Sequence, residues 1–319
     1  MIQVRGPSVA AALLADTLLG EPPEATHPVV LMGHVISAFE KRMLGLKEAH
    51  HLRLAAGMFL AVVLPTLSYA LVHIALRLAP PKLRWTFEVG LLSTALSMRG
   101  LGRAALAVER ELNGCALEAA RTRVGELVGR DTEHLDPSGI SRAAIESVAE
   151  NTSDGVVAPM LYGLLLGAPG ALAYKAINTL DSMIGHPHPP YEHLGWASAR
   201  LDDLANLLPA RLTALLVAAV SGSAGDAGAT LATAHRYGPL TKSPNAGWAE
   251  AAFAGALGLR LGGANSYGGI LRKGPVLGTG RSPEAADIRR AVGLMRRACL
   301  LLAGLALALR AISGGRAGG

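Results

Sequence analysis

The chain has 319 residues, of which 50% are hydrophobic and 17% are charged, and its formal net charge is +6. A soluble domain carries about a quarter charged residues, so this composition, with a mean hydropathy of +0.34, argues against a soluble protein and predicts a membrane protein. Only 4% of residues are aromatic, which leaves few platforms for stacking nucleic-acid bases. We therefore expect no nucleic-acid partner.

The N-terminal third is expected to contain the first membrane helices. Arg5 precedes the apolar run VAAALLADTLLG, which is short for a signal peptide and is interrupted by Asp16, so we interpret it as a retained first membrane helix. An amphipathic helix is predicted over 29–42. Residues 54–76 form the clearest transmembrane helix, and 85–98 are apolar but short.

The middle of the chain alternates between polar and apolar segments. Residues 99–150 are predicted to form a helical extramembrane insertion, and Asp136-Pro137-Ser138 is typical of a helix start. Residues 156–174 are apolar but are interrupted by proline and glycine, as in broken membrane helices that line a polar cavity. A full crossing would place the polar residues before and after this run on opposite faces, whereas a re-entrant path would let them meet. We favour the second arrangement.

The last third is expected to begin with a span over 204–220 and to end with a short helix over 299–312. Residues 222–297 are predicted to form a basic, glycine-rich loop region. Ten Lys or Arg residues stand there against four acidic residues, an excess of six, which predicts a cytoplasmic position. The fold class is then all-α: one integral membrane domain over 1–319, with about 4–6 membrane helices, some short or broken, plus amphipathic helical loops.

Three polar clusters lie beside these apolar segments. The first has carboxylates at i, i+4 and i+8, on one helical face, and all three clusters combine carboxylates with amides. They are Glu146, Glu150, Asn151 and Asp154; Lys175, Asn178 and Asp181; and Arg200, Asp202, Asp203 and Asn206. One such cluster is as well explained by a helix cap or an interfacial ion pair, but three favour a functional polar site. Carboxylate and amide oxygens suit Mg²⁺.

The sequence lacks the motifs of several classes of enzyme. The sequence has no GxSxG, HExxH, CxxC or dinucleotide-binding fingerprint, and the glycine-rich loop is not a P-loop. Cys115 and Cys299 are far apart and are interpreted as reduced structural thiols. His27 and His34 have no partner at zinc spacing and are interpreted as ordinary polar side chains.

Long motifs in the sequence resemble the CobD/CbiB family of cobalamin biosynthesis proteins. They are LLADTLLGEPPEATHPVVLMG, ENTSDGVVAP, KAINTLDSMIGH, GWASARLDDLANLLPARLT, SPNAG and LGGANSYGG, and they cover the chain from about Asp16 to Gly269 in the family's order. The segment HPHPPYEHLG departs from the pattern because it is unusually rich in histidine and proline. AmpE-type membrane proteins are distant relatives, and the intact SPNAG and RLDDLAN motifs argue against that group.

The resemblance implies a multi-pass inner (plasma) membrane enzyme, an adenosylcobinamide-phosphate synthase. Such an enzyme joins adenosylcobyric acid to (R)-1-amino-2-propanol or its O-phosphate through an amide bond, and we expect it to use ATP as co-substrate and Mg²⁺ as cofactor. The expected partners are these substrates and the lipid bilayer. A homo-oligomer, or association with other membrane proteins of the pathway, is left open.

Roles are predicted for residues of the matching motifs. The catalytic residues would be Glu150, Lys175, Asp181 and Asp202, with Asp181 taking the proton from the attacking amine. The Mg²⁺ ligands would come from Glu146, Glu150, Asp154, Asp181, Asp202 and Asp203. The substrate-binding residues would be Asn151, Asn178, Arg200, Asn206, Arg211, Ser243, Asn245 and Tyr267.

The competing hypothesis is a membrane transporter or binding protein for an anionic or corrinoid ligand. Intramembrane acids and broken helices mark transporter sites as well. A transporter is expected to show inverted repeats or paired broken helices, and the sequence has one clearly interrupted segment. An AmpE-like membrane protein without the synthase activity is the other alternative.

Overall fold

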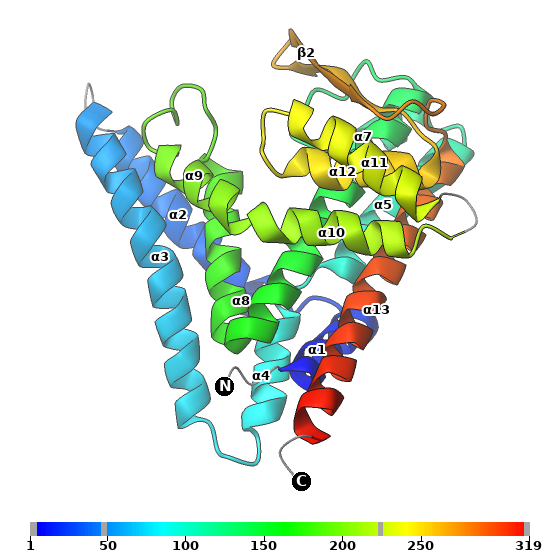
Figure 1. Cartoon of the computed structure of the whole chain (residues 1–319). Helices are drawn as coiled ribbons and strands as arrows, with labels where there is room; N and C mark the ends of the chain where they lie inside the picture. The colour runs from blue at the N-terminus through cyan, green and yellow to red at the C-terminus, as the bar shows by residue number, and fades with distance from the viewer. Residues whose placement is uncertain (1–4, 46–49, 223–225, 316–319) are drawn as a thin grey trace. The chain divides into compact units, whose positions relative to one another are not determined.

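The computed structural model describes residues 5–45, 50–222 and 226–315. The chain is predominantly helical (Figure 1). Its internal packing divides it into two compact units. Unit 1 consists of Met1–Ser97, Ala158–Asn206 and Ala303–Gly319, and unit 2 consists of Met98–Val157 and Leu207–Leu302. This division follows the packing of the chain, and the single integral membrane domain stays a prediction.

Unit 1 is entirely helical within the part of the chain that the structure describes. Its elements are α1 (Gly6–Leu19), η1 (Glu24–Thr26), α2 (Pro28–Leu44), α3 (His50–Leu78), α4 (Arg84–Ser93), α8 (Ala158–Ile184), α9 (Trp196–Ala205) and the last part of α13 (Ala285–Gly315). Helix α3 packs along α8 and α9, and α1 packs against α4.

Helix α3 confirms the helix expected at 54–76 and is long enough and apolar enough to cross a membrane. It buries Leu60 and Leu64 inside unit 1, while Phe59 and Val62 are 60% and 65% exposed. Its 29 residues extend about 44 Å at 1.5 Å per residue, more than the roughly 30 Å of a bilayer core. An apolar surface of this length is typical of a helix that faces lipid.

Helix α8 is interrupted, as the sequence predicts. Gly167 has φ 76° and ψ −165°, and Pro169 follows two residues later inside the same helix. A Cβ atom at Gly167 would overlap the guanidinium of Arg5, so the break also brings the start of α1 against α8. Upstream, the residues Ser153–Val157 form a π-helical turn, η2, directly before α8.

Three helical segments are long enough and apolar enough to cross a membrane, among the residues described. They are His50–Leu78, Pro137–Ile184 and Ala285–Ile312. The short last helix expected at 299–312 is therefore wrong, because α13 has 31 residues. The span expected at 204–220 is also wrong: α10 (Leu207–Ala219) has 13 residues, about 20 Å, which is less than a bilayer core. Helix α1, with 14 residues, is likewise short.

Unit 2 combines helices with one β-hairpin. Its elements are α5 (Met98–Asn113), α6 (Leu117–Gly125), α7 (Pro137–Thr152), η2, α10, α11 (Ala227–Tyr237), η4 (Gly238–Leu240), α12 (Ala246–Leu257), β1 (Leu261–Tyr267), β2 (Ile270–Leu277) and the first part of α13. Helix α7 begins as expected, since the side chain of Asp136 accepts a hydrogen bond from the Gly139 amide.

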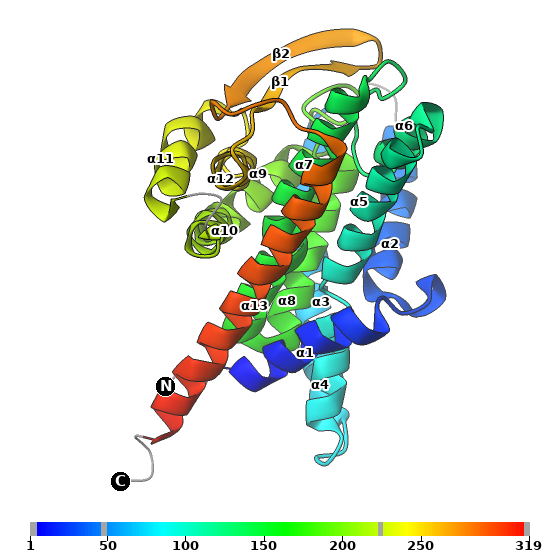
Figure 2. The same ribbon diagram turned by 90° about the vertical axis from the view of Figure 1, so that its right-hand side faces the viewer.

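The region 222–297 is not a loop, which corrects the sequence-based interpretation. It contains α11, α12 and the antiparallel strands β1 and β2, which form a hairpin beside α11 and α12 (Figure 2). The register pairs Leu261 with Leu277, and it shifts between Gly262 and Ala264. Gly262 and Gly263 have φ of 73° and 90°, which a side-chain-bearing residue rarely adopts. The glycines that suggested a loop therefore form a β-bulge.

Candidate functional site

Unit 2 contains a polar cavity of about 280 Å³ between α7, α12 and the hairpin, which we call the unit 2 pocket. Carboxylates from two helices line it together with an arginine and two residues of β1. These residues are Arg130, Glu146, Glu150, Glu250, Asn265 and Tyr267. The first predicted cluster thus contributes Glu146 and Glu150, and the glycine-rich motif contributes Tyr267, to one site.

Glu146 holds the hairpin against α7. Its side chain is 8% exposed, Oε1 accepts a hydrogen bond from the Gly262 amide at 2.6 Å, and Oε2 forms an ion pair with Arg130. Arg130 also donates to Oδ1 of Asn265. Both oxygens of Glu146 are therefore engaged by protein groups. This arrangement favours a structural role for Glu146 over its predicted role as a Mg²⁺ ligand.

Arg142 ties α7 to the bulge of β1. Its guanidinium donates to the carbonyl of Gly262, to the carbonyl of Ala264 at 3.1 Å and to Oδ1 of Asn265 at 2.9 Å. A Cβ atom at Gly263 would lie 3.2 Å from this guanidinium. The absence of a side chain at Gly263 therefore allows Arg142 to approach the backbone of β1.

Glu250 makes the unit 2 pocket electrostatically unusual. Burial in α12 raises the pKa of its carboxyl well above the ordinary value, and the nearby negative charges of Glu146 and Glu150 act in the same direction, partly offset by Arg130. Three carboxyl groups near one another favour a proton on one of them or a bound cation. Glu150 and Glu250 are the oxygen donors here that suit Mg²⁺.

The SPNAG motif forms the turn before α12 and reaches the unit 2 pocket through Thr241. The Thr241 hydroxyl donates to the Ser243 carbonyl at 2.8 Å, and Oγ of Ser243 accepts from the Asn245 amide at 3.2 Å. Oδ1 of Asn245 accepts from Arg211 at 3.0 Å, and the Arg211 guanidinium lies 4.8 Å from the centre of the Trp248 ring. The structure thus brings the predicted binding residues Arg211, Ser243 and Asn245 to one turn.

Unit 1 contains a second polar group between α8 and α9, which we call the unit 1 cluster. It joins Lys175, Asn178, Asp202 and Asn206 from the second and third predicted clusters. Lys175 Nζ donates to Asn178 Oδ1 at 2.9 Å, and Asn206 Nδ2 donates to Asp202 Oδ2 at 2.9 Å. The hydroxyl of Tyr174 donates to Asn206 Oδ1 at 2.8 Å.

Asp202 is the acid of the unit 1 cluster, and it is buried, with 9% of its surface exposed. Burial raises the pKa of its carboxyl, while hydrogen bonds from the amides of Asn206 and Asn178 and the charge of Lys175 act in the opposite direction. A carboxylate held in such surroundings is a better proton acceptor near neutral pH than an exposed one.

The other predicted residues are distributed over both units. Asp203 pairs with Arg200 at 3.4 Å, and 69% of the Arg200 side chain is exposed. Asn151 donates to the carbonyl of Ser147 within α7, and Asp154 lies in the π-turn η2. Asp181 lies near the end of α8, with its carboxylate against Gly185. The first cluster belongs to unit 2 and the others to unit 1. The convergence of all three stays a prediction.

His27 is a satisfied polar side chain, as expected, because it caps α2 by accepting from the Val29 amide. Burial lowers the pKa of its imidazole, Glu21 raises it, and the charge of Lys175 lowers it further. Sequence reasoning missed other residues of these sites. Glu250 was detectable as the only acid within the apolar helix Ala246–Leu257. Arg130 and Arg142 carry no such local signal.

Comparison with known proteins identifies the family. The model of the CobD/CbiB proteins matches residues 9–295. Two relatives are named cobalamin biosynthesis protein CobD: that of Klebsiella pneumoniae is 41% identical over 94% of this chain and 95% of its own length, and that of Chromobacterium violaceum is 43% identical over 95% and 96%. The cobalamin biosynthesis protein CbiB of Salmonella arizonae is 40% identical over 94% and 95%. No solved structure matches the chain significantly. The chain belongs to the CobD/CbiB family.

Proposed function

We propose that this protein acts in cobalamin biosynthesis as an adenosylcobinamide-phosphate synthase. It would join a propionate carboxylate of adenosylcobyric acid to the amine of (R)-1-amino-2-propanol or its O-phosphate. Family membership and the names of the relatives support the pathway. The observation that supports the chemistry is the unit 2 pocket, where acidic and basic side chains face a cavity formed by three separate elements.

The reaction needs an activated carboxylate, because a carboxylate ion is a poor electrophile. In the proposed sequence the propionate oxygen attacks the γ-phosphorus of ATP, an acyl phosphate forms and ADP leaves. The amine then attacks the acyl carbon, loses a proton, and expels inorganic phosphate as the amide forms. The net products are the amide, ADP, phosphate and one proton.

The unit 2 pocket is suited to the phosphate-bearing part of this reaction. A cavity of about 280 Å³ has the size for a small group and not for a whole corrinoid. Glu150 and Glu250 would hold Mg²⁺, which neutralises phosphate charge when bound. Arg130 is kept in position by Glu146 and Asn265, so its charge is fixed at the wall of the cavity.

The unit 1 cluster is a second candidate position for chemistry. Lys175 supplies a cation for a carboxylate or a phosphate, and Asp202 supplies a buried proton acceptor for the amine. The raised pKa makes Asp202 a stronger candidate for the general base than Asp181, to which we assigned this role from the sequence.

The test uses the full chain purified in detergent with adenosylcobyric acid, aminopropanol or its O-phosphate, ATP and Mg²⁺, and follows the corrinoid product by mass. We expect a mass gain equal to the amide, lost when ATP or Mg²⁺ is omitted. No product in the complete mixture, with corrinoid binding retained, would contradict the synthase and support a carrier.

Variants distinguish the two sites. Glu150→Ala and Glu250→Gln test the unit 2 pocket, and Asp202→Asn tests the unit 1 cluster. Loss of a general base or of a metal ligand is expected to lower kcat by about 10²-fold or more. The matched control is Glu118→Gln, since the Glu118 side chain is 85% exposed and pairs with Arg121 of its own helix. Full activity in both the Glu150→Ala and the Asp202→Asn variants would contradict the proposed site residues.

A further inference from the structure

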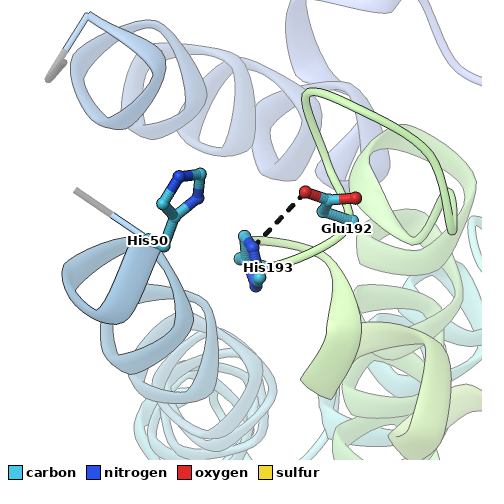
Figure 3. A group of neighbouring side chains, drawn as sticks. All are labelled: His50, Glu192 and His193. Atoms are coloured by element: carbon cyan, nitrogen blue, oxygen red, sulfur yellow. Dashed lines mark ion pairs between the residues drawn. The ribbon is translucent and has the colours of Figure 1, made fainter. Parts of the chain in front are cut away.

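Two histidines and a glutamate meet on the surface of unit 1, away from the unit 1 cluster. His50 begins α3, and Glu192 and His193 lie in the loop before α9 (Figure 3). One ligand atom from each residue lies within 4.8 Å of the others. Nε2 of His193 is 3.3 Å from Oε1 of Glu192, and the rings of His50 and His193 are 4.8 Å apart at their centres.

Backbone packing fixes the position of the loop before α9 relative to α3. Leu194, the neighbour of His193, is fully buried, and a Cβ atom at Gly57 would overlap the Leu194 carbonyl. The loop therefore rests directly on the helix surface at Gly57. Gly57 follows His50 by seven residues, about two helical turns, so both lie on the same face of α3. The position of His50 relative to His193 is thus set by close packing and not by the side chains alone.

A hydrogen bond to α2 also holds the loop before α9. The hydroxyl of Tyr191 donates to Oε1 of Glu40 in α2 at 2.6 Å. The loop is thereby attached to α2 just before Glu192 and to α3 just after His193. Preorganised ligands reduce the entropy lost when an ion binds.

The donor set indicates the class of ion. Imidazole nitrogens with one carboxylate suit Zn²⁺, Co²⁺, Ni²⁺ and Cu²⁺, whereas Mg²⁺ prefers oxygen ligands. Metal bonds of about 2.0–2.2 Å place tetrahedral ligands roughly 3.4 Å apart. The pair Glu192–His193 already has this spacing, and a ring nitrogen of His50 lies within 4.8 Å of both ligand atoms.

We propose that His50, Glu192 and His193 bind a divalent transition-metal ion, with Zn²⁺ as the probe. The three protein ligands leave the fourth position to water. This site gives a role to Glu192 and His193 of the segment HPHPPYEHLG, to which the proposed synthase reaction assigns none. A bound ion would link the start of α3 to the loop that joins α8 to α9, the two helices that carry the unit 1 cluster.

The test measures Zn²⁺ affinity in the full chain, purified through a tag without histidines, by competition with a chromophoric chelator. We expect one tightly bound Zn²⁺ per chain, and an affinity lower by about tenfold or more in His50→Ala and in His193→Ala. The matched control is His51→Ala, which removes the adjacent exposed histidine of α3 and is expected to keep wild-type affinity.

Two further readouts separate this site from general metal binding. Zn²⁺ is expected to raise the unfolding temperature of the wild type and of His51→Ala, but not of His50→Ala. Excess Mg²⁺ is expected to leave bound Zn²⁺ in place. The proposal is overturned if the double variant His50→Ala/His193→Ala binds Zn²⁺ as tightly as the wild type, or if His51→Ala loses as much affinity as His50→Ala.

Discussion

The ion pair between Arg130 and Glu146 shows how single residues organise unit 2. Both side chains are less than one-tenth exposed, and each also contacts β1, Arg130 through Asn265 and Glu146 through the Gly262 amide. A buried pair adds little stability compared with apolar residues, but removal of one partner leaves a buried charge. The pair therefore acts mainly to specify where β1 attaches to α7.

Glu146→Ala is expected to destabilise unit 2 by about 3–5 kcal/mol, because Arg130 would lose its counter-charge in a buried position. Glu146→Gln is expected to cost less, since the amide oxygen can still accept from Gly262. Glu118→Ala removes an exposed pair and is expected to cost less than about 1 kcal/mol. Thermal unfolding in detergent measures all three. Equal losses for Glu146→Ala and Glu118→Ala would show that the buried pair has no special role.

At the scale of elements, the turn of the β-hairpin is held by an aspartate outside the hairpin. Asp131 accepts hydrogen bonds from the Ser266 hydroxyl at 2.6 Å and from the amides of Gly268 and Gly269 at 2.9 and 2.8 Å. These bonds satisfy the turn between β1 and β2 and lower the pKa of the Asp131 carboxyl below its ordinary 3.8. The turn is thus stabilised by the ionised form.

A lowered folded pKa means that the contribution of Asp131 is present above pH 3.8 and is lost as the pH falls through the folded pKa. Asp131→Ala is therefore expected to increase amide exchange in the hairpin at neutral pH. The variant is also expected to lack the loss of protection that acidification causes in the wild type. Hydrogen exchange of residues 261–277, measured against pH, checks this expectation. A hairpin equally protected in the wild type and in the variant would contradict it.

Close packing of α3 against the loop before α9 gives a second prediction at this scale. Gly57→Ala places a methyl group against the Leu194 carbonyl and is expected to cost about 1–3 kcal/mol of stability. Gly90→Ala in α4 meets no atom within 4 Å and is expected to be neutral or to stabilise by up to about 1 kcal/mol. Unfolding temperatures of the two variants compare them directly, and similar values would refute the packing argument.

For the whole molecule, the length and exposed apolar surface of α3 predict that its ends lie on opposite faces of a membrane. In a variant with Cys115 and Cys299 replaced by serine, His51→Cys and Lys82→Cys introduce thiols at the two ends. An impermeant thiol reagent added to sealed vesicles is expected to label one position and not the other, and both after permeabilisation. Labelling of both before permeabilisation would show that α3 does not cross.

The sequence predicted local features well and tertiary ones poorly. Periodicity and apolar runs identified α3, the start of α7 at Asp136 and the break in α8, since each depends on nearby residues. Helix α13 was predicted too short because Arg289, Arg290, Arg296 and Arg297 interrupt the apolar pattern of its first half. The glycines of β1 suggested a loop, although they form a bulge.

For the candidate sites too, local features could be predicted from the sequence and tertiary contacts could not. The sequence motifs identified Glu150, Lys175, Asn178 and Asp202. The structure places Glu150 in the unit 2 pocket and the other three in the unit 1 cluster. The motifs could not identify Arg130 or Arg142, because their importance comes from contacts with β1 more than a hundred residues away along the chain. The metal-binding histidines likewise come from two segments, His50 and His193, that only the fold brings together.

The contact between α1 and α13 has a consequence for biosynthesis. A Cβ atom at Gly6 would overlap the backbone of Ala306, so the first and last helices of unit 1 touch through their main chains. Unit 2 is complete once the ribosome has made Leu302, whereas unit 1 must wait for the segment that begins at Ala303. During translation α1 therefore lacks this neighbour until the segment after Leu302 has been made. A released fragment that ends at Leu302 is expected to contain a finished unit 2 and an open unit 1.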